Sequence, residues 1–199
     1  MPRAGLTQAT VVREAARLAD EVGHDKLTLA AVAARLGVAL PSLYKHVRGA
    51  DALAQQLAAL ATAELADELT NAAVGRAGRD ALHAVAAAWR DYAHRHPGRY
   101  PAAQRVPDPT DPDHVAAGRR ALDVVYAILR GYGLTGDAAV DAARTFRSAV
   151  HGFVALESAG GFGLPRRIDH SYDQLVAVLD TAFRDWPVPR ARPAPEGDR

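Results

Sequence analysis

The chain has 199 residues, of which 49% are hydrophobic and 24% charged, and its formal net charge at pH 7 is +1. This composition is that of a folded domain, and no run approaches the ~18 apolar residues that a membrane span needs. The absence of cysteine excludes disulfide scaffolds, thiolate zinc sites and a cysteine nucleophile. Because residues 1–5 show no apolar signal-peptide segment, we expect a cytoplasmic protein with no membrane partner.

The whole chain has helical periodicity, and no segment alternates with period two, which predicts an all-α fold of about nine helices. Thr7 and Thr28 are suitable N-caps of the first two helices, Gly37 ends the second, and Asp169 is a suitable N-cap of the last. In chain order, the predicted helices cover residues 7–22, 28–36, 40–47, 51–73, 79–96, 100–104, 113–132, 135–159 and 169–186.

Glycine and proline positions divide the chain into parts. Residues 1–50 are predicted to form one domain, which a helix over 51–73 connects to a second domain over 74–186. The proline-rich residues 106–112 are predicted to form a loop, and the proline-rich residues 187–199 a disordered tail.

Basic residues concentrate in the first of these domains. Residues 1–50 contain seven lysines and arginines against four acidic residues, a net charge of +3, whereas the rest of the chain carries −2. This asymmetry indicates a local contact with a polyanion. An ordinary solvated face has a similar charge pattern, so the charge alone leaves both interpretations open.

Residues 28–47, TLAAVAARLGVALPSLYKHV, have the pattern of a helix-turn-helix. Apolar residues bury the first helix, Gly37 permits the sharp turn, and Leu43 and Val47 bury the inner side of the second helix. A helix presented in this way fits the major groove of DNA, which is about 12 Å wide. Its start and outer face carry Leu40, Pro41, Ser42, Tyr44, Lys45 and His46.

The same residues resemble those of the tetracycline-repressor (TetR) family of bacterial regulators. The stretch LGVALPSLYKHV matches the family pattern of LGV followed by LY, one residue and H, and the resemblance extends over residues 6–57. Two positions depart from it: Ala39 stands where a capping residue is frequent, and Ala50 where many members have a lysine that contacts phosphate. The resemblance implies a regulator that binds duplex DNA.

The DNA-contacting set that the resemblance implies consists of Thr28, Leu40, Pro41, Ser42, Tyr44, Lys45, His46 and Arg48. Hydroxyl and cationic groups in this set would bind phosphate, whereas the apolar Leu40 and Pro41 favour contact with thymine methyl groups. Simpler interpretations remain open: Tyr44 could be a packing residue, Lys45 a solvated charge, and His46 a partner of the local backbone.

A second resemblance covers the C-terminal part of the chain. Residues 150–163, VHGFVALESAGGFG, are similar to a C-terminal domain of this family named for a Trp-His-Gly motif, with Val150 in place of the tryptophan. In that domain the last two helices pair with those of a second copy, which implies a homodimer. A two-fold dimer would place its recognition helices about 34–36 Å apart and predicts a near-palindromic operator.

Members of the family bind an inducer inside the domain that corresponds to residues 74–186, which implies a small-molecule effector. Such a cavity would be largely apolar with polar side chains such as His83, Tyr92 or His151, which favours an uncharged or aromatic molecule. The alternative interpretation is that the candidate residues only fill the core. Chosen by helical facing, these candidates are Trp89, Tyr92, His96, Tyr100, Tyr126, Phe146, Val150 and Phe153.

Catalytic motifs are absent from the sequence, which has no P-loop, no His-x-x-x-His pair and no glycine-rich dinucleotide turn. We therefore expect no enzyme, cofactor or metal site, but a nucleoid-associated repressor that a largely apolar effector releases from its operator. The alternative is a helical ligand-binding or structural module whose helix-turn-helix does not function. Absence of salt-dependent binding to duplex DNA would favour that alternative.

Overall fold

The computed structural model describes residues 6–187, and within them it contains nine α-helices, one 3-10 helix (His24–Lys26) and no β-strand. The expected all-α fold is thereby confirmed. The helices are α1 (Gln8–Val22), α2 (Leu29–Leu36), α3 (Leu40–Leu43), α4 (Ala50–Ala73), α5 (Gly78–Arg95), α6 (Tyr100–Ala103), α7 (Pro112–Gly131), α8 (Gly136–Ser158) and α9 (Ile168–Arg184).

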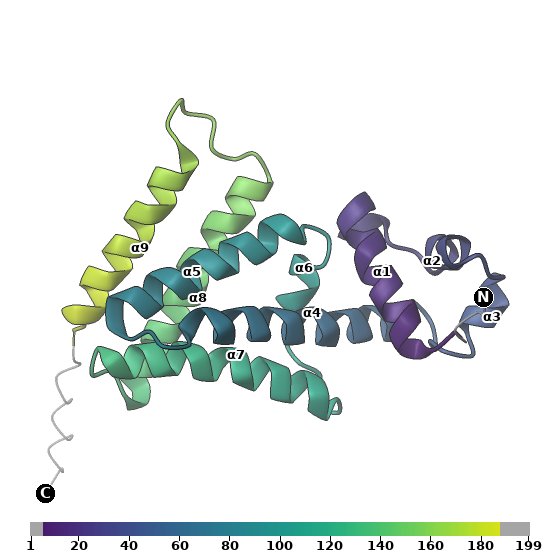
Figure 1. Ribbon diagram of the computed structural model, residues 1–199, viewed down its shortest axis with the longest axis horizontal. Helices are drawn as coiled ribbons and strands as arrows, with labels where there is room; N and C mark the ends of the chain where they lie inside the picture. Colours follow the sequence, from purple (N-terminus) through teal and green to yellow (C-terminus); the bar gives the residue numbers. More distant parts are fainter. Residues whose placement is uncertain (1–5, 188–199) are drawn as a thin grey trace, which may run out of the picture.

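The molecule is elongated, and α4 lies along its long axis (Figure 1). Helices α1, α2 and α3 gather at one end of the molecule, and α9 lies at the other end. Between them α4 packs against α5, α6 and α7, and α5 in turn packs against α8 and α9. We call helices α5 to α9, together with the part of α4 that packs on them, the body. The single helix α4 therefore belongs both to the N-terminal helices and to the body.

Buried side chains form two clusters along this axis. The smaller cluster joins α1 to α4 through residues such as Val11, Leu43 and Leu53. The larger cluster fills the body and includes Phe146 of α8 and Phe183 of α9, both buried. This arrangement agrees with the two predicted domains, whose boundaries stay a prediction.

The predicted signals at the ends of the first two helices all form. The Thr7 hydroxyl accepts a hydrogen bond from the Thr10 N–H, and the Thr28 hydroxyl accepts one from the Ala31 N–H. Gly37 has φ +66°, a left-handed conformation that suits glycine and ends α2 with its N–H bonded back into the helix.

Most helices match their predicted bounds to within one residue at each end, and two, α3 and α9, differ by more. Helix α3 ends at Leu43, and the chain continues to Val47 as turns in which the Val47 N–H still bonds to the Leu43 carbonyl. Helix α9 begins at Ile168 rather than after Asp169, whose carboxylate instead accepts a hydrogen bond from the Arg90 guanidinium at 2.9 Å. The predicted disorder of the tail concerns residues that lie outside the described part of the chain.

Candidate functional site

The first candidate surface is the end of the molecule formed by α2, α3 and the turn that follows. Leu43 and Val47 are completely buried in the smaller cluster, which fixes the orientation of the residues between them. Tyr44 is consequently 52% exposed, and Lys45 beside it is also exposed. Burial at one face thus presents a phenol and an ammonium group to solvent at the other.

The other predicted contact residues lie around this turn with different exposures. Pro41 and Arg48 are exposed, whereas Ser42 and His46 are half-buried. Leu40 is half-buried too, because it packs against the smaller cluster, so only part of its side chain is free for a base contact. The structure therefore brings the predicted set to one end of the molecule (Figure 1).

Thr28 and the start of α4 add groups that could bind an anion. The Thr28 hydroxyl accepts the capping hydrogen bond of α2 and keeps its own proton free to donate. Ala39 gives α3 no side-chain cap, as predicted, and Gly49 gives none to α4. The first N–H groups of α4 lack an intrahelical partner, which makes them suitable donors to phosphate. In α3, by contrast, Pro41 has no N–H and the Ser42 N–H bonds to the Ala39 carbonyl.

Arg35 is basic and lies near this surface, but its guanidinium is paired with acidic side chains of α1. Its guanidinium binds Glu21 of α1 through two hydrogen bonds of 2.6 and 2.7 Å and binds Glu14 at 3.1 Å. The hydrogen bond to Glu21 raises the pKa of Arg35 and lowers that of Glu21. These bonds tie α2 to α1 and engage a charge that composition alone would assign to DNA.

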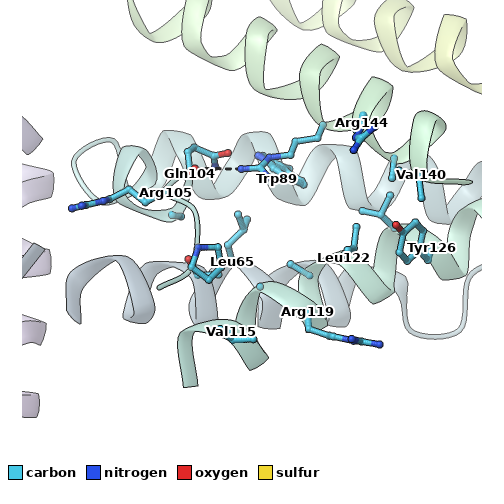
Figure 2. Close-up of a pocket in the computed structure, with 18 residues that line it drawn as sticks. Leu65, Trp89, Gln104, Arg105, Val115, Arg119, Leu122, Tyr126, Val140 and Arg144 are labelled. Carbon is cyan, nitrogen blue, oxygen red and sulfur yellow. Dashed lines mark hydrogen bonds between the residues drawn. The ribbon is translucent and has the colours of Figure 1, made fainter. Parts of the chain in front are cut away.

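The second candidate site is a cavity of about 520 Å³ in the body, between α4, α5, α7 and α8 (Figure 2). Trp89 and Tyr126 from the predicted set line it, together with apolar residues such as Leu65, Leu122 and Val125. Its volume is in the range of small-molecule sites.

The other six predicted lining residues do not line this cavity. Phe146 packs edge-on against Trp89, and Phe153 packs against Phe162 and Tyr172. The remaining four, which are buried or half-buried in the body, are Tyr92, His96, Tyr100 and Val150. The suggested polar residues His83 and His151 are likewise absent from its wall.

Four arginines at the cavity were not identified by sequence reasoning: Arg105, Arg119, Arg144 and Arg147. The two on α8 have a signal in the sequence, because positions 140, 143, 144 and 147 form one face of a helix. That face begins with Val140 and Ala143 and ends with the two arginines, and all four residues line the cavity.

A hydrogen-bonded chain connects the cavity wall to the core of the body. Trp89 Nε1 donates to the Tyr100 hydroxyl at 3.0 Å, and that hydroxyl lies 2.9 Å from Nδ1 of His151. Burial raises the pKa of Tyr100 to about 12, while burial and the charge of Arg147 lower the pKa of His151. The lowered pKa of His151 favours the neutral imidazole, whose unprotonated Nδ1 can accept the Tyr100 proton in the Nε2–H tautomer.

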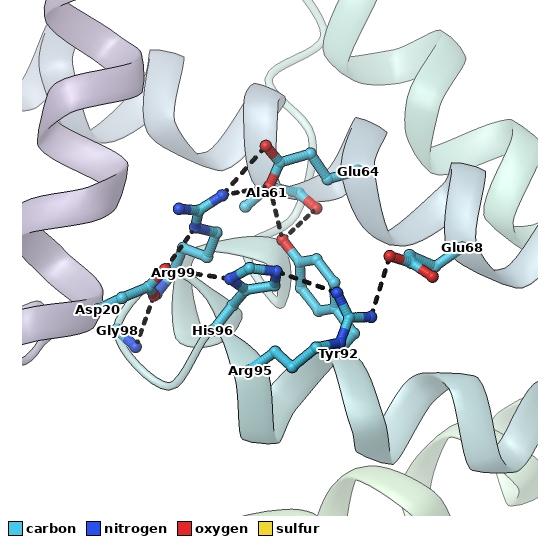
Figure 3. A network of polar contacts seen from close by, with 9 residues as sticks. All are labelled: Asp20, Ala61, Glu64, Glu68, Tyr92, Arg95, His96, Gly98 and Arg99. Carbon is cyan, nitrogen blue, oxygen red and sulfur yellow. Dashed lines mark hydrogen bonds and ion pairs between the residues drawn. The ribbon is translucent and has the colours of Figure 1, made fainter.

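A polar junction joins α1 to the turn before α6 (Figure 3). Asp20 Oδ1 accepts hydrogen bonds from the backbone N–H groups of Gly98 and Arg99 at 3.1 and 2.9 Å. Its Oδ2 atom lies 2.8 Å from Nε of Arg99 and 3.2 Å from Nδ1 of His96. One carboxylate thus holds the turn against the N-terminal helices.

The same junction continues into the body through Arg99. Its guanidinium binds the Glu64 carboxylate of α4 at 2.9 and 3.1 Å, and Glu64 accepts a hydrogen bond from the Tyr92 hydroxyl at 3.2 Å. Burial, reinforced by the Glu64 charge, raises the pKa of Tyr92 and keeps its hydroxyl protonated. Helices α1, α4 and α5 therefore meet at this junction.

Residues 6–187 include no group of three or more histidine or acidic side chains arranged to hold a metal ion. No helix in that range is both long and apolar enough to span a bilayer.

Two family models match the two parts of the chain. Residues 11–57 match the bacterial regulatory proteins of the tetR family, and residues 82–179 match the tetracycline repressor-like C-terminal domain. The first match covers the helix-turn-helix and the start of α4, and the second includes most of the body.

Individual proteins agree with these models. The chain is 42% identical over 158 residues to an uncharacterised helix-turn-helix transcriptional regulator of Mycobacterium tuberculosis, which covers 79% of this chain and 72% of that protein. It is 34% identical over 161 residues to the class A tetracycline repressor of Escherichia coli transposon 1721, covering 76% and 67% respectively. A crystal structure of a TetR variant from Acinetobacter baumannii in complex with minocycline is 26% identical, with a TM-score of 0.70 and coverage of 91% and 98%.

Proposed function

Since this chain belongs to the TetR family of bacterial DNA-binding transcriptional regulators, we propose that it is a homodimeric repressor with a small-molecule effector. It would bind a near-palindromic operator on the nucleoid and leave that operator when the effector occupies the cavity of the body.

The end of α3 and the turn that follows it, residues 43–48, are called the recognition turn here. The observation that carries the proposal is that this turn has a buried and an exposed side. Buried Leu43 and Val47 fix the position of the turn. Tyr44, Lys45 and Arg48 are exposed to solvent near the N-terminus of α4. Hydroxyl, ammonium and guanidinium groups bind phosphate and set the position of a recognition helix on DNA. Partly exposed Leu40 and exposed Pro41 would then contact the bases.

Support for a dimer comes from the outer face of α8 and α9. Leu156 of α8 and Val178 of α9 are 54% and 64% exposed, and the small side chains of Ala155 and Thr181 are exposed on the same two helices. Small side chains allow helices to approach closely, and the two apolar residues gain from burial. A second copy of the same face is the occupant we propose.

A conformational change at the cavity would reach the DNA-binding helices through α6 and the turn before it, at Gly98 and Arg99. Gln104 and Arg105, which line the cavity, directly follow α6, and Asp20 of α1 holds the turn at its start. A ligand that displaces this segment would move α1 and the helices packed on it. Release requires that the ligand bind better to the arrangement that does not fit DNA.

Selection of genomic DNA fragments by the purified protein, followed by sequencing, tests this function. We expect enrichment of a short near-palindrome whose half-sites are about one helical turn apart. Sequence-independent binding that disappears as salt rises would contradict the proposal. That result would favour a helical ligand-binding module without operator recognition.

A further inference from the structure

We propose that the cavity binds an amphipathic organic anion, a carboxylate carried on an apolar chain or ring. The inference rests on the proposed function, in which this cavity is the effector site, and adds the charge and shape of the effector.

The interior of the cavity is suited to an apolar skeleton. Side chains of α4, α5 and α7, including Leu65, Trp89 and Leu122, form its wall (Figure 2). Transfer of apolar surface from water to such a wall is favourable. Non-specific burial of this kind selects for an apolar molecule but not for its charge.

The charged groups at the cavity are all of one sign. Its lining includes four arginines and no aspartate or glutamate. Among residues 6–187, these four arginines form one ion pair, between Arg144 and Asp141 at 3.8 Å, and both of its side chains are exposed. A site with four guanidinium groups and so little compensation favours a negatively charged ligand.

The two arginines of α8 identify where the negative group would lie. Arg144 and Arg147 are one turn apart, and the Arg147 guanidinium donates to the Gln104 carbonyl oxygen at 3.3 Å. Arg105 and Arg119 extend outward at two sides of the cavity, where they would attract an anion from solvent (Figure 2). A guanidinium fork matches the two oxygens of a carboxylate.

Gln104 supplies an independent indication of an acceptor at this point. Its Nε2 atom is buried and has no hydrogen-bond partner among the described residues. A buried donor without a partner is costly, and a ligand oxygen would satisfy it. Gln104 and Arg147 belong to one wall of the cavity, so a rotation of the Gln104 side chain toward the cavity would let one carboxylate accept from both.

Binding of matched acids and amides to the full-length protein tests the charge of the ligand. The probes are octanoate against octanamide and 2-naphthoate against 2-naphthamide, measured by isothermal titration calorimetry at low and moderate salt. We expect at least one acid to bind about tenfold or more tightly than its amide, with a preference that weakens as salt rises. Whichever acid binds distinguishes a chain from a ring as the skeleton.

Variants test the position of the charge. The double variant Arg144→Gln/Arg147→Gln should reduce the preference for acid over amide to less than about threefold. The matched control Arg130→Gln/Arg166→Gln removes two exposed arginines that do not line the cavity and should leave the preference unchanged.

Equal binding of acid and amide by the unmodified protein, or binding of neither acid, would overturn the inference even if the double variant fails to fold. An unchanged preference in a folded double variant would overturn it as well. Operator selection, measured without any probe, tests the proposed function separately. A selective repressor that binds no acid would contradict only the inference about the ligand.

Discussion

Neighbouring residues of the recognition turn have opposite environments, since Leu43 is fully buried and Tyr44 is 52% exposed. A packing role for Tyr44, which the sequence left open, therefore applies to only about half of its surface. The phenol hydroxyl is free to donate to a phosphate oxygen, and Lys45 beside it can contribute a charge.

These exposures predict separate effects on operator binding. Because a dimer carries each change twice, Lys45→Ala should lower the slope of log K against log salt by about two, the value for two phosphate contacts, and Tyr44→Phe should weaken binding about 25-fold through loss of two hydrogen bonds. Fluorescence anisotropy over a range of salt concentrations measures both. Arg166→Ala, in the loop before α9, is the control and should change neither; unchanged binding in both test variants would remove these residues from the DNA contact set.

The neutral state of His151 predicts a pH dependence of stability. Burial lowers its folded-state pKa below the unfolded value of about 6.5, so the unfolded chain binds more protons as the pH falls through that range. Protonation of Nδ1 would also remove the acceptor of the Tyr100 hydroxyl.

Stability should therefore decrease between pH 7.5 and 5.5, and His151→Gln should show a smaller decrease. Urea unfolding at the two pH values measures the difference. His170→Gln, which replaces an exposed histidine, should keep the dependence of the unmodified protein. Identical pH dependence in all three proteins would show that His151 does not contribute.

At the scale of elements, the junction between α1 and the turn before α6 leaves no room for a larger residue. A Cβ atom on Gly98 would lie 1.7 Å from the carbonyl oxygen of Ala19, and that oxygen belongs to the backbone of α1. Gly98→Ala should therefore lower the free energy of unfolding by at least about 2 kcal/mol. Urea unfolding checks this.

The matched control is Gly163→Ala, because a Cβ atom there meets no heavy atom within 4 Å. It should change the free energy of unfolding by less than about 0.5 kcal/mol. Equal stability of the two variants would mean that α1 and the turn are not held together as closely as the structure has them.

Helix ends could be predicted from the sequence where the signal is local. Thr28 and Gly37 act on backbone groups within a few residues, so each cap follows from its own segment. Asp169 could not be placed in this way, because its partner Arg90 lies 79 positions earlier in the chain. A residue that binds a distant guanidinium has no fixed position relative to the helix end.

The cavity shows the same limit for faces of helices. Periodicity correctly indicated that Trp89 and Phe146 face inward, but only Trp89 lines the cavity. Both side chains are apolar and buried, and the choice between wall and core depends on how neighbouring helices are spaced. Arg144 and Arg147 line the cavity although they are exposed, and their position at the edge of an apolar face is also that of ordinary solvated residues, so the sequence alone did not distinguish them.

At the scale of the whole molecule, the proposed dimer predicts the effect of a charge on α9. Val178→Asp places a carboxylate in the proposed interface and should produce a monomer in sedimentation velocity. Operator affinity should fall at least about 100-fold, because two linked half-site contacts become independent. Val74→Asp, at a 69% exposed position after α4, should remain dimeric. A dimeric Val178→Asp protein with full affinity would place the interface elsewhere.

Helix α4 extends from the N-terminal helices into the body, so a tilt of this helix would move both of its ends. Its 24 residues extend about 36 Å, with Leu53 in the cluster beneath the recognition turn and Thr62 and Leu65 in the wall of the cavity. A tilt of about 8° at Leu65 would displace the start of the helix, about 22 Å away, by roughly 3 Å, close to the spacing of about 3.4 Å between successive base pairs. In a dimer two such displacements add, so a small rotation at the cavity would put the two recognition turns out of register with successive major grooves.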